Sequence, residues 1–158
     1  MFRPMRRKNR AISEEAAKAL LKKERRGVLA VNGDDGYPYA VPVNFYFDEA
    51  NQKIYFHGAC AGHKADAIRR CDKVCFTVYG NETAAEESWA PYMQSVVVFG
   101  SCRVILNEAE KLDKLRLLAG KYYPETDLVE EEIAKSGQAA RMYEIEIRHL
   151  SGKQIQEK

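Results

Sequence analysis

The chain has 158 residues, a length typical of one domain, so we expect a single domain over residues 1–158. Apolar residues make up 46% of the sequence and charged residues 30%, as in an ordinary globular protein. The net charge of +2 does not favour nucleic acid as a partner, and no apolar run reaches the ~20 residues of a membrane span.

The first ten residues, MFRPMRRKNR, are rich in arginine and lysine, and we expect a flexible basic tail over residues 1–10. The segment that follows is charged and lacks the apolar stretch of a signal peptide, so we expect a cytoplasmic protein. In that compartment cysteines stay reduced. The cysteines are Cys60, Cys71, Cys75 and Cys102.

The first third of the chain predicts a helix followed by a hairpin. Ser13 has the character of an N-cap, Glu14 and Glu15 follow in the first turn, and the helix is expected to end near Gly27. GVLAV and YPYAVPVNFYF then read as two strands joined by the turn NGDDG. The second strand contains two prolines, which cannot donate to a ladder, so it has an edge, a bulge or a ligand beside it.

The middle of the chain alternates between strands and one short helix. KIYFHG predicts a strand, GHKADAIRRC a helix with Ala65 and Ile68 on one face, and KVCFTVYG a further strand. Residues 81–91 predict a loop. SVVVFGSCRVIL then predicts a long strand in which Gly100 marks a bulge or a close contact.

The last third predicts two helices, at 107–123 and 127–137, and a final strand. That strand, MYEIEIRHL, alternates apolar and charged residues, which predicts one buried face and one wet face with Glu144 on the wet side. Altogether the pattern gives about six strands, mostly joined by hairpins. We therefore expect a mainly β fold with peripheral helices, in which a six-stranded antiparallel barrel is closed or partly closed.

The stretch IYFHGACAGHKADAIRRC passes from strand to helix and allows three interpretations. His57, Cys60 and His63 are spaced like metal ligands, although they lack the paired knuckles of structural zinc sites. The glycine-rich turn before a helix, with His63 and Lys64 at the helix start, also suits a phosphate group. Finally, Cys60 or Cys71 is either a nucleophile or an inert packed thiol.

Four separated stretches carry a resemblance to a known family. They are GVLAVNGDDGYPYAVPVNFYFD, KIYFHGACAGHKADAIRRCDKVCFTV, SVVVFGSCRVIL and YEIEIRHLSGKQ. In this order they resemble the FMN-binding split-barrel proteins related to pyridoxamine 5′-phosphate oxidase, above all the nitroimidazole-resistance (Nim-type) branch. The resemblance implies a split β-barrel that forms a homodimer, with FMN at the subunit interface. The basic residues that hold the vitamin phosphate in the oxidase proper have no match near IRHLSGKQ, so oxidation of pyridoxamine phosphate is not implied.

The resemblance assigns nine residues to the cofactor. It also implies that the stretch IYFHGACAGHKADAIRRC is a phosphate site without a metal. The nine are Pro42, Val43 and Asn44 at the flavin ring, Phe56, His57 and Gly58 at the ribityl chain and phosphate, His63 and Lys64 at the phosphate, and Ser95, which reaches the flavin of the partner chain.

The implied function is an FMN-dependent oxidoreductase that reduces a small, electron-poor substrate. His57 is the candidate proton donor, and its alternative role is a hydrogen bond to the phosphate or the ribityl chain. Trp89, Tyr92 and Met93 either cover the substrate side of the ring or pack in the dimer. The competing function is a non-catalytic protein that binds a flavin or haem for storage or sensing.

Overall fold

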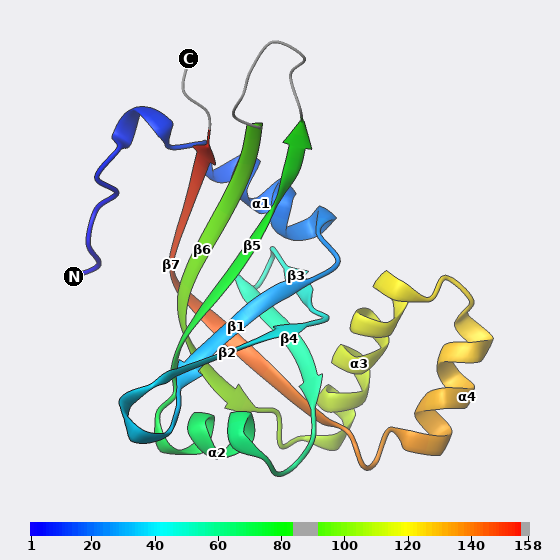
Figure 1. The fold of residues 1–158 in the computed structure, drawn as a ribbon. Coiled ribbons are helices and arrows are strands. Elements are labelled where there is room, and N and C mark those ends of the chain that lie inside the picture. Colours follow the sequence, from blue (N-terminus) through cyan, green and yellow to red (C-terminus); the bar gives the residue numbers. More distant parts are fainter. Residues whose placement is uncertain (84–91, 156–158) are drawn as a thin grey trace.

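The computed structural model describes residues 1–83 and 92–155, which form seven strands and four α-helices (Figure 1). The strands are β1 (Gly27–Asn32), β2 (Pro38–Val43), β3 (Tyr46–Asp48), β4 (Lys53–Gly58), β5 (Lys73–Thr83), β6 (Tyr92–Val104) and β7 (Arg141–Ile155). The helices are α1 (Glu14–Lys23), α2 (His63–Arg70), α3 (Glu108–Tyr122) and α4 (Thr126–Ser136).

The strands form one antiparallel sheet in the order β2-β1-β5-β6-β7-β4-β3. The long strands β5, β6 and β7 run together through the molecule, and the sheet curls so that β1 and β2 cross in front of β4 (Figure 1). The expected mainly β split barrel with peripheral helices is confirmed. Gly100 lies at a register shift between β6 and β7, and a Cβ there would come within 2.5 Å of the Glu146 carbonyl oxygen, which confirms both a bulge and a close contact.

The sheet has seven strands where the sequence predicts six, because the stretch YPYAVPVNFYF divides at Asn44 and Phe45. The backbone N–H of Phe45 donates to the hydroxyl of Tyr122 at 2.9 Å, and its carbonyl accepts from Lys121 Nζ at 3.1 Å. These groups are therefore bound by side chains of α3 instead of a neighbouring strand. β2 and β3 consequently lie at opposite ends of the sheet order.

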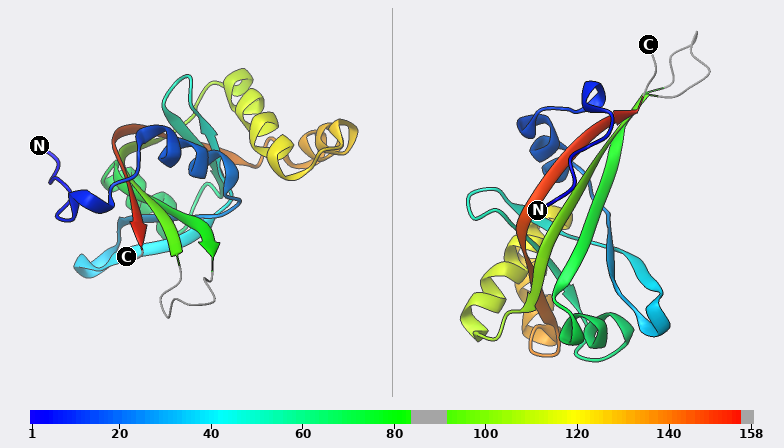
Figure 2. Two further views of the ribbon diagram at one scale, coloured as in Figure 1. Left: turned by 90° about the horizontal axis from the view of Figure 1, so that it is seen from above. Right: turned by 90° about the vertical axis from the view of Figure 1, so that its left-hand side faces the viewer.

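The helices cover the open parts of the barrel. α1 begins at the Ser13 cap, whose hydroxyl accepts from the Ala16 N–H at 3.1 Å, and it buries Leu20 and Leu21 against the core. α2 closes the lower end in Figure 1, while α3 and α4 lie to one side of the barrel (Figure 2). Among the described residues, none of the helices is long and apolar enough to span a membrane.

Glu144 is buried, with 1% of its surface exposed, so its expected position on a wet face is wrong. Its carboxylate accepts from Lys53 Nζ on β4 at 3.1 Å and from Arg103 Nε on β6 at 2.5 Å. Because β7 is paired on both edges here, the two neighbouring strands bring cations over the carboxylate and compensate its burial.

The N-terminal segment lies against the outer surface of the sheet. The ring of Phe2 stacks on His149 at a centroid distance of 4.9 Å and on Phe99 at 5.7 Å. Residues Lys8–Arg10 form one 3-10 turn, and Ala11 bridges to Lys153 of β7. The flexibility expected for residues 1–10 stays a prediction.

Candidate functional site

The turn between β4 and α2 brings Lys64 against the end of β4, and we call the segment from Gly58 to Lys64 the cradle. A Cβ at Gly58 would come within 3.2 Å of both Lys64 Nζ and a ring carbon of Tyr143, so glycine allows these two side chains to pack closely against the strand end. Gly62 precedes α2 with a φ of +117°, a backbone conformation that residues other than glycine rarely adopt. The first N–H groups of a helix have no partner within the helix, and such groups commonly bind anions.

Lys64 is the charged group of this cradle. Its side chain is partly buried, and its Nζ lies 5.4 Å from the centre of the Phe56 ring. Burial lowers the pKa of its ammonium group. Within residues 1–83 and 92–155 no carboxylate lies within ion-pair distance of Lys64, so the ammonium group keeps its charge available for an anion from outside.

His57 stands on the same strand end and faces solvent on one side. Burial of its other side, and then the nearby charge of Lys64, lower the pKa of His57. The lowered pKa favours the neutral imidazole, which offers one N–H donor and one acceptor nitrogen.

His63 turns away from this pair toward the hairpin that joins β1 and β2. Its ring stacks on Tyr39 at 4.0 Å, and its Nε2 lies 3.5 Å from a carboxylate oxygen of Asp34. Arg70 also contacts Asp34, at 2.6 Å. His63 and Lys64 thus both stand at the start of α2, but their side chains have different surroundings.

The three residues expected at the flavin ring follow one another at the end of β2. Pro42 is exposed on the outer face, Val43 is buried in the core, and Asn44 lies partly buried in the link to β3. The link is fixed from α3: the Tyr122 hydroxyl donates to the Arg25 carbonyl at 2.6 Å, and Lys121 Nζ donates to the carbonyls of Glu24 and Phe45.

Sequence reasoning missed Lys121 and Tyr122. They stand at the end of an amphipathic helix, and no pattern there signals contact with a segment more than seventy positions earlier. Burial lowers the pKa of Lys121 to about 8, although its ammonium group contacts carbonyls and the Phe45 ring. These contacts make Lys121 a support of the link between β2 and β3.

Ser95 lies far along β6 from α2, toward the upper end of the long strands (Figure 1), and pairs with Tyr79 and Lys153. Its side chain belongs to the outer face of the sheet, because the alternate residues Val96 and Val98 are buried. Within one chain it is therefore not brought together with Lys64.

Of the three residues expected to cover the ring or pack in the dimer, Trp89 lies outside the described residues. Tyr92 and Met93 open β6, and the Tyr92 hydroxyl donates to Gln154 at 2.8 Å.

The four cysteines are free thiols. Cys60 lies 3.9 Å from the Ala139 carbonyl, and Cys71 accepts from the Asn32 amide at 3.2 Å. In the described part of the chain, no three His, Cys, Asp or Glu side chains gather in a way that could hold a metal ion.

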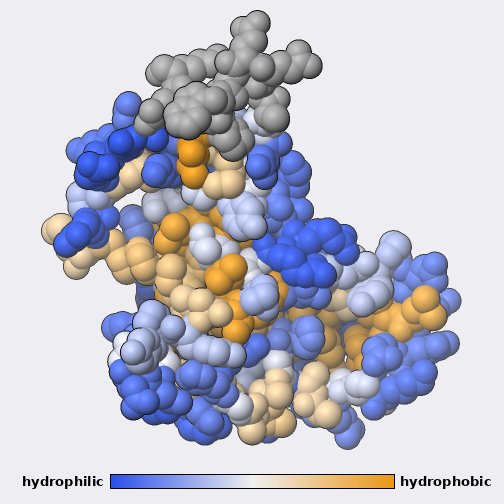
Figure 3. Space-filling model, in the orientation of Figure 1, coloured by the Kyte–Doolittle hydropathy of each residue, from blue (hydrophilic) through white to orange (hydrophobic). Residues whose placement is uncertain are grey.

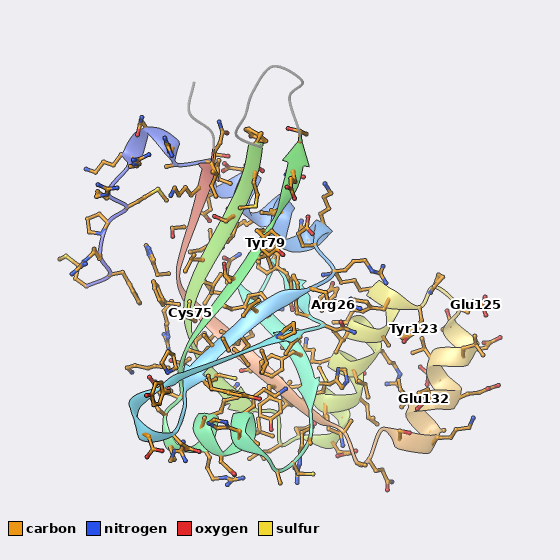
Figure 4. All side chains as sticks on the ribbon, viewed as in Figure 1. Arg26, Cys75, Tyr79, Tyr123, Glu125 and Glu132 are labelled. Carbon is orange, nitrogen blue, oxygen red and sulfur yellow. The ribbon has the colours of Figure 1, made fainter. Side chains whose placement is uncertain are left out.

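The outer face that carries Ser95 also carries a group of apolar side chains. Cross-strand neighbours form two rows on it, which are listed here: Pro42, Val28, Thr77 and Val97 in one, and Ala40, Ala30, Cys75 and Phe99 in the other. Figure 3 shows apolar side chains gathered over these strands, and Figure 4 labels Cys75 and Tyr79 along β5. We call these two rows the outer apolar face.

Many solved structures share this fold, and three of them are described here. A candidate 5-nitroimidazole antibiotic resistance protein from Bacteroides thetaiotaomicron has a TM-score of 0.76 at 18% identity, over 91% of this chain and 86% of that one. The flavocytochrome Anf3 from Azotobacter vinelandii has a TM-score of 0.77 at 23% identity, over 98% of this chain and 73% of its own. An FAD-binding protein from Mesorhizobium loti has a TM-score of 0.66 at 20% identity, over 93% and 98%.

Among curated proteins, none matches this chain. The family model described as pyridoxamine 5′-phosphate oxidase does match, over residues 13–154. That range includes β1 to β6, all of β7 but its last residue, the cradle at Gly58 and Lys64, and the link held by Lys121 and Tyr122. By this match, which takes in nearly the whole chain, the protein belongs to the pyridoxamine 5′-phosphate oxidase family of split-barrel proteins.

Proposed function

We propose that this protein binds FMN and is an oxidoreductase that reduces a small, electron-poor substrate. Lys64 and the first turn of α2 would bind the flavin phosphate, with His63 beside them. Phe56, His57 and Gly58 would contact the ribityl chain, and Pro42, Val43 and Asn44 the edge of the ring. FMN, when bound, supplies the electron-transfer chemistry.

The observation that carries this proposal is the partly buried Lys64 ammonium, which has no carboxylate partner among the described residues. It packs against the strand end at Gly58 and belongs to the first turn of α2. A positive charge at a helix N-terminus suits a phosphate group.

The chain's own residues act by position and by hydrogen bonding. His57 can donate an N–H hydrogen bond to the phosphate or the ribityl chain, and in its imidazolium form it can pass a proton to a reduced substrate; its lowered pKa favours the first role. Tyr122 and Lys121 hold the link at Asn44 in one conformation, so the ring edge meets a preorganised backbone.

The proposed assembly is a homodimer that packs through the outer apolar face. Thr77, Val97 and Phe99 on this face would be buried by a second copy, and Ser95 beside them would reach the partner's flavin. This arrangement accounts for the position of Ser95, which is remote from Lys64 within one chain.

The substrate class follows from two supports. The similar structure from Bacteroides thetaiotaomicron is named for 5-nitroimidazole resistance, and the sequence resembles the Nim-type branch. A nitro-substituted aromatic ring is electron-poor and planar, and can stack on a flavin ring. We therefore propose nitroaromatic reduction as the reaction.

The second candidate is a protein that binds a flavin or haem without turnover. Support comes from the names of two similar structures, a flavocytochrome and an FAD-binding protein. In this case the cofactor would be held for storage or sensing.

The first experiment is an absorption spectrum of the purified protein before and after addition of FMN, with the released ligand identified by mass spectrometry. Flavin bands shifted by the protein, followed by oxidation of a reduced nicotinamide that depends on a 5-nitroimidazole, would support the oxidoreductase. Flavin binding without turnover would favour the second candidate. An absorption spectrum that shows no FMN binding would contradict both flavin proposals. Titration with haem would then follow.

A further inference from the structure

Three positively charged side chains gather around the ring of Tyr122, where α3 meets the link between β2 and β3. The guanidinium carbons of Arg25 and Arg26 lie 4.9 Å and 5.8 Å from the centre of this ring, and Lys121 Nζ lies 5.7 Å from it. Each distance is within the range of a cation–π contact. We call Arg25, Arg26 and Lys121 the cation cluster.

The cation cluster has no acidic partner that would balance its charge. In residues 1–83 and 92–155, none of its three members lies within ion-pair distance of a carboxylate. Glu24 directly precedes Arg25, but its carboxylate lies at Gly80 on β5, where an added Cβ would overlap it. The positive charges of the cluster therefore repel one another.

Lys121 shows the effect of this crowding. Burial and then the charge of Arg25 lower the pKa of its ammonium group to about 8, and the charge of Glu24 offsets this shift only in part. Its Nζ donates to the carbonyls of Glu24 and Phe45, which carry no charge. A bound anion would stabilise the charged form of Lys121 and reduce the repulsion within the cluster.

The two arginines of the cluster keep most of their hydrogen-bond donors available. Arg26 donates from one terminal nitrogen to the Arg25 carbonyl at 3.3 Å, and among the described residues this is the only hydrogen bond that either guanidinium group makes. Both side chains are exposed. Because a guanidinium group holds several N–H donors in one plane, the pair suits a carboxylate, whose two oxygens accept such bonds in parallel.

The cation cluster adjoins the residues expected at the flavin ring. Gly27 of β1 pairs with Val43 of β2 in the antiparallel ladder. Arg26 and Asn44 are the next residues beyond this pair on the two strands. Figure 4 labels Arg26 on the side of the barrel that faces α3. The cluster therefore borders the same link that would meet the edge of the ring.

From this arrangement we propose that the cation cluster binds a carboxylate group of the substrate, so that the preferred substrates are nitroaromatic acids. This inference rests on the proposed function, because it adds a charged group to the electron-poor ring that the protein would reduce. Arg25 and Arg26 donate hydrogen bonds to the carboxylate oxygens. Lys121 adds its positive charge from the α3 side of the link.

The first test needs no flavin. The purified full-length chain is titrated with benzoate and with benzamide, which has a similar shape but no charge, and binding is followed by NMR. The unchanged protein is compared with Arg26→Gln and with the double variant Arg25→Gln/Arg26→Gln. Arg116→Gln is the matched control, because it removes a guanidinium group of α3 that pairs with Glu130. Circular dichroism shows whether each variant is folded.

We expect benzoate to bind at least about 10-fold more tightly than benzamide, because it gains a charge-assisted contact. The double variant should lose this difference, Arg26→Gln should lose part of it, and Arg116→Gln should behave like the unchanged protein. Benzoate should also raise the pKa of Lys121 above about 8, which NMR of the lysine side-chain signals measures.

The second test uses the FMN-loaded protein with a reduced nicotinamide and compares 4-nitrobenzoate with 4-nitrobenzamide as substrates. We expect a KM about 10-fold lower for the acid and similar kcat values, because the carboxylate contact is made equally before and during the reaction. In the double variant the two KM values should become equal.

Equal binding of benzoate and benzamide, or benzoate binding that the double variant retains, would overturn the carboxylate site and leave the proposed function standing. Benzoate binding as expected, by a protein that takes up no FMN, would support the carboxylate site and contradict the proposed function. Equal KM values for the two nitro compounds in the unchanged protein would overturn the assignment of this site to the substrate.

Discussion

At the scale of single residues, the cradle depends on one charge. Lys64 is the one partly buried lysine or arginine at the turn from β4 to α2, and Phe56 and Tyr143 fill the space behind it. An anion bound there would compensate an ammonium group whose burial costs free energy in the empty protein. The empty and loaded states should therefore differ most at this position.

Replacement of Lys64 by alanine should weaken FMN binding by about 1.5–3 kcal/mol, or ~10- to 100-fold, because one charge-assisted contact is lost. Fluorescence titration with FMN measures the change. Lys73→Ala is the matched control, since 82% of its side chain is exposed and it stands on β5. Equal affinities of the two variants would remove Lys64 from the phosphate site.

The pH dependence of His57 gives a second prediction. Without ligand, its pKa should lie below the ordinary value of about 6.5, and FMN should raise it, because a nearby phosphate favours the imidazolium ion. NMR titration of the histidine ring signals measures both values, with His57→Gln to assign the signal. A pKa that FMN leaves unchanged would separate His57 from the phosphate.

The same shift affects stability. Because the folded pKa is lowered, the unfolded chain binds the proton more readily, so His57 should decrease the stability of the ligand-free fold as the pH falls below about 6.5.

At the scale of helices and strands, local sequence rules predict most of the fold. The Ser13 cap, the bulge at Gly100 and the short helix after Gly62 each follow from residues close in the chain. For the same reason, the closeness of Phe56, Gly58 and Lys64 could be foreseen from one turn. The division of β2 from β3 could not, because it depends on Tyr122 and its neighbour reaching back to Phe45.

Glu144 shows a second limit of periodicity. Strand alternation gives the face of a side chain but does not reveal that neighbouring strands bring Lys53 and Arg103 over it. One cation on each side of Glu144 turns an expected surface position into a buried ion cluster. This cluster depends on strand order and register.

Glu144→Ala should therefore destabilise the protein by about 1–3 kcal/mol, because buried hydrogen bonds to charged groups are lost. Glu146→Ala on the same strand is the control and should stay within about 0.5 kcal/mol of the unchanged protein, since Glu146 is exposed. Urea unfolding followed by circular dichroism measures both. A similar loss in the two variants would mean that the cluster contributes nothing particular to stability.

At the scale of the whole molecule, the two parts of the proposed flavin site that one chain provides lie at different ends of a long sheet. The cradle stands beside α2 at the lower end, while Ser95 stands on the outer apolar face near the upper end (Figure 1). A single chain therefore provides only part of the proposed flavin site, and the proposed second copy provides the rest.

Val97→Asp tests this arrangement, because a carboxylate buried in the proposed interface would cost about 3 kcal/mol or more, raising the dimer dissociation constant by ~100-fold. Analytical ultracentrifugation measures the assembly, and FMN affinity should fall with it. Leu128→Asp is the control: Leu128 is 54% exposed on α4, outside the outer apolar face. A variant at Val97 that assembles like the unchanged protein would exclude this face as the interface.

The contact of Phe2 with Phe99 and His149 has a practical consequence. The N-terminal segment already covers part of the surface to which we propose the second copy binds. The segment and the second copy would therefore compete for contact with the rings of Phe99 and His149. An affinity tag fused before Met1 would add its bulk to this competition and weaken self-association. Dimerisation and cofactor binding should therefore be measured on protein whose tag is placed after Lys158 or has been removed.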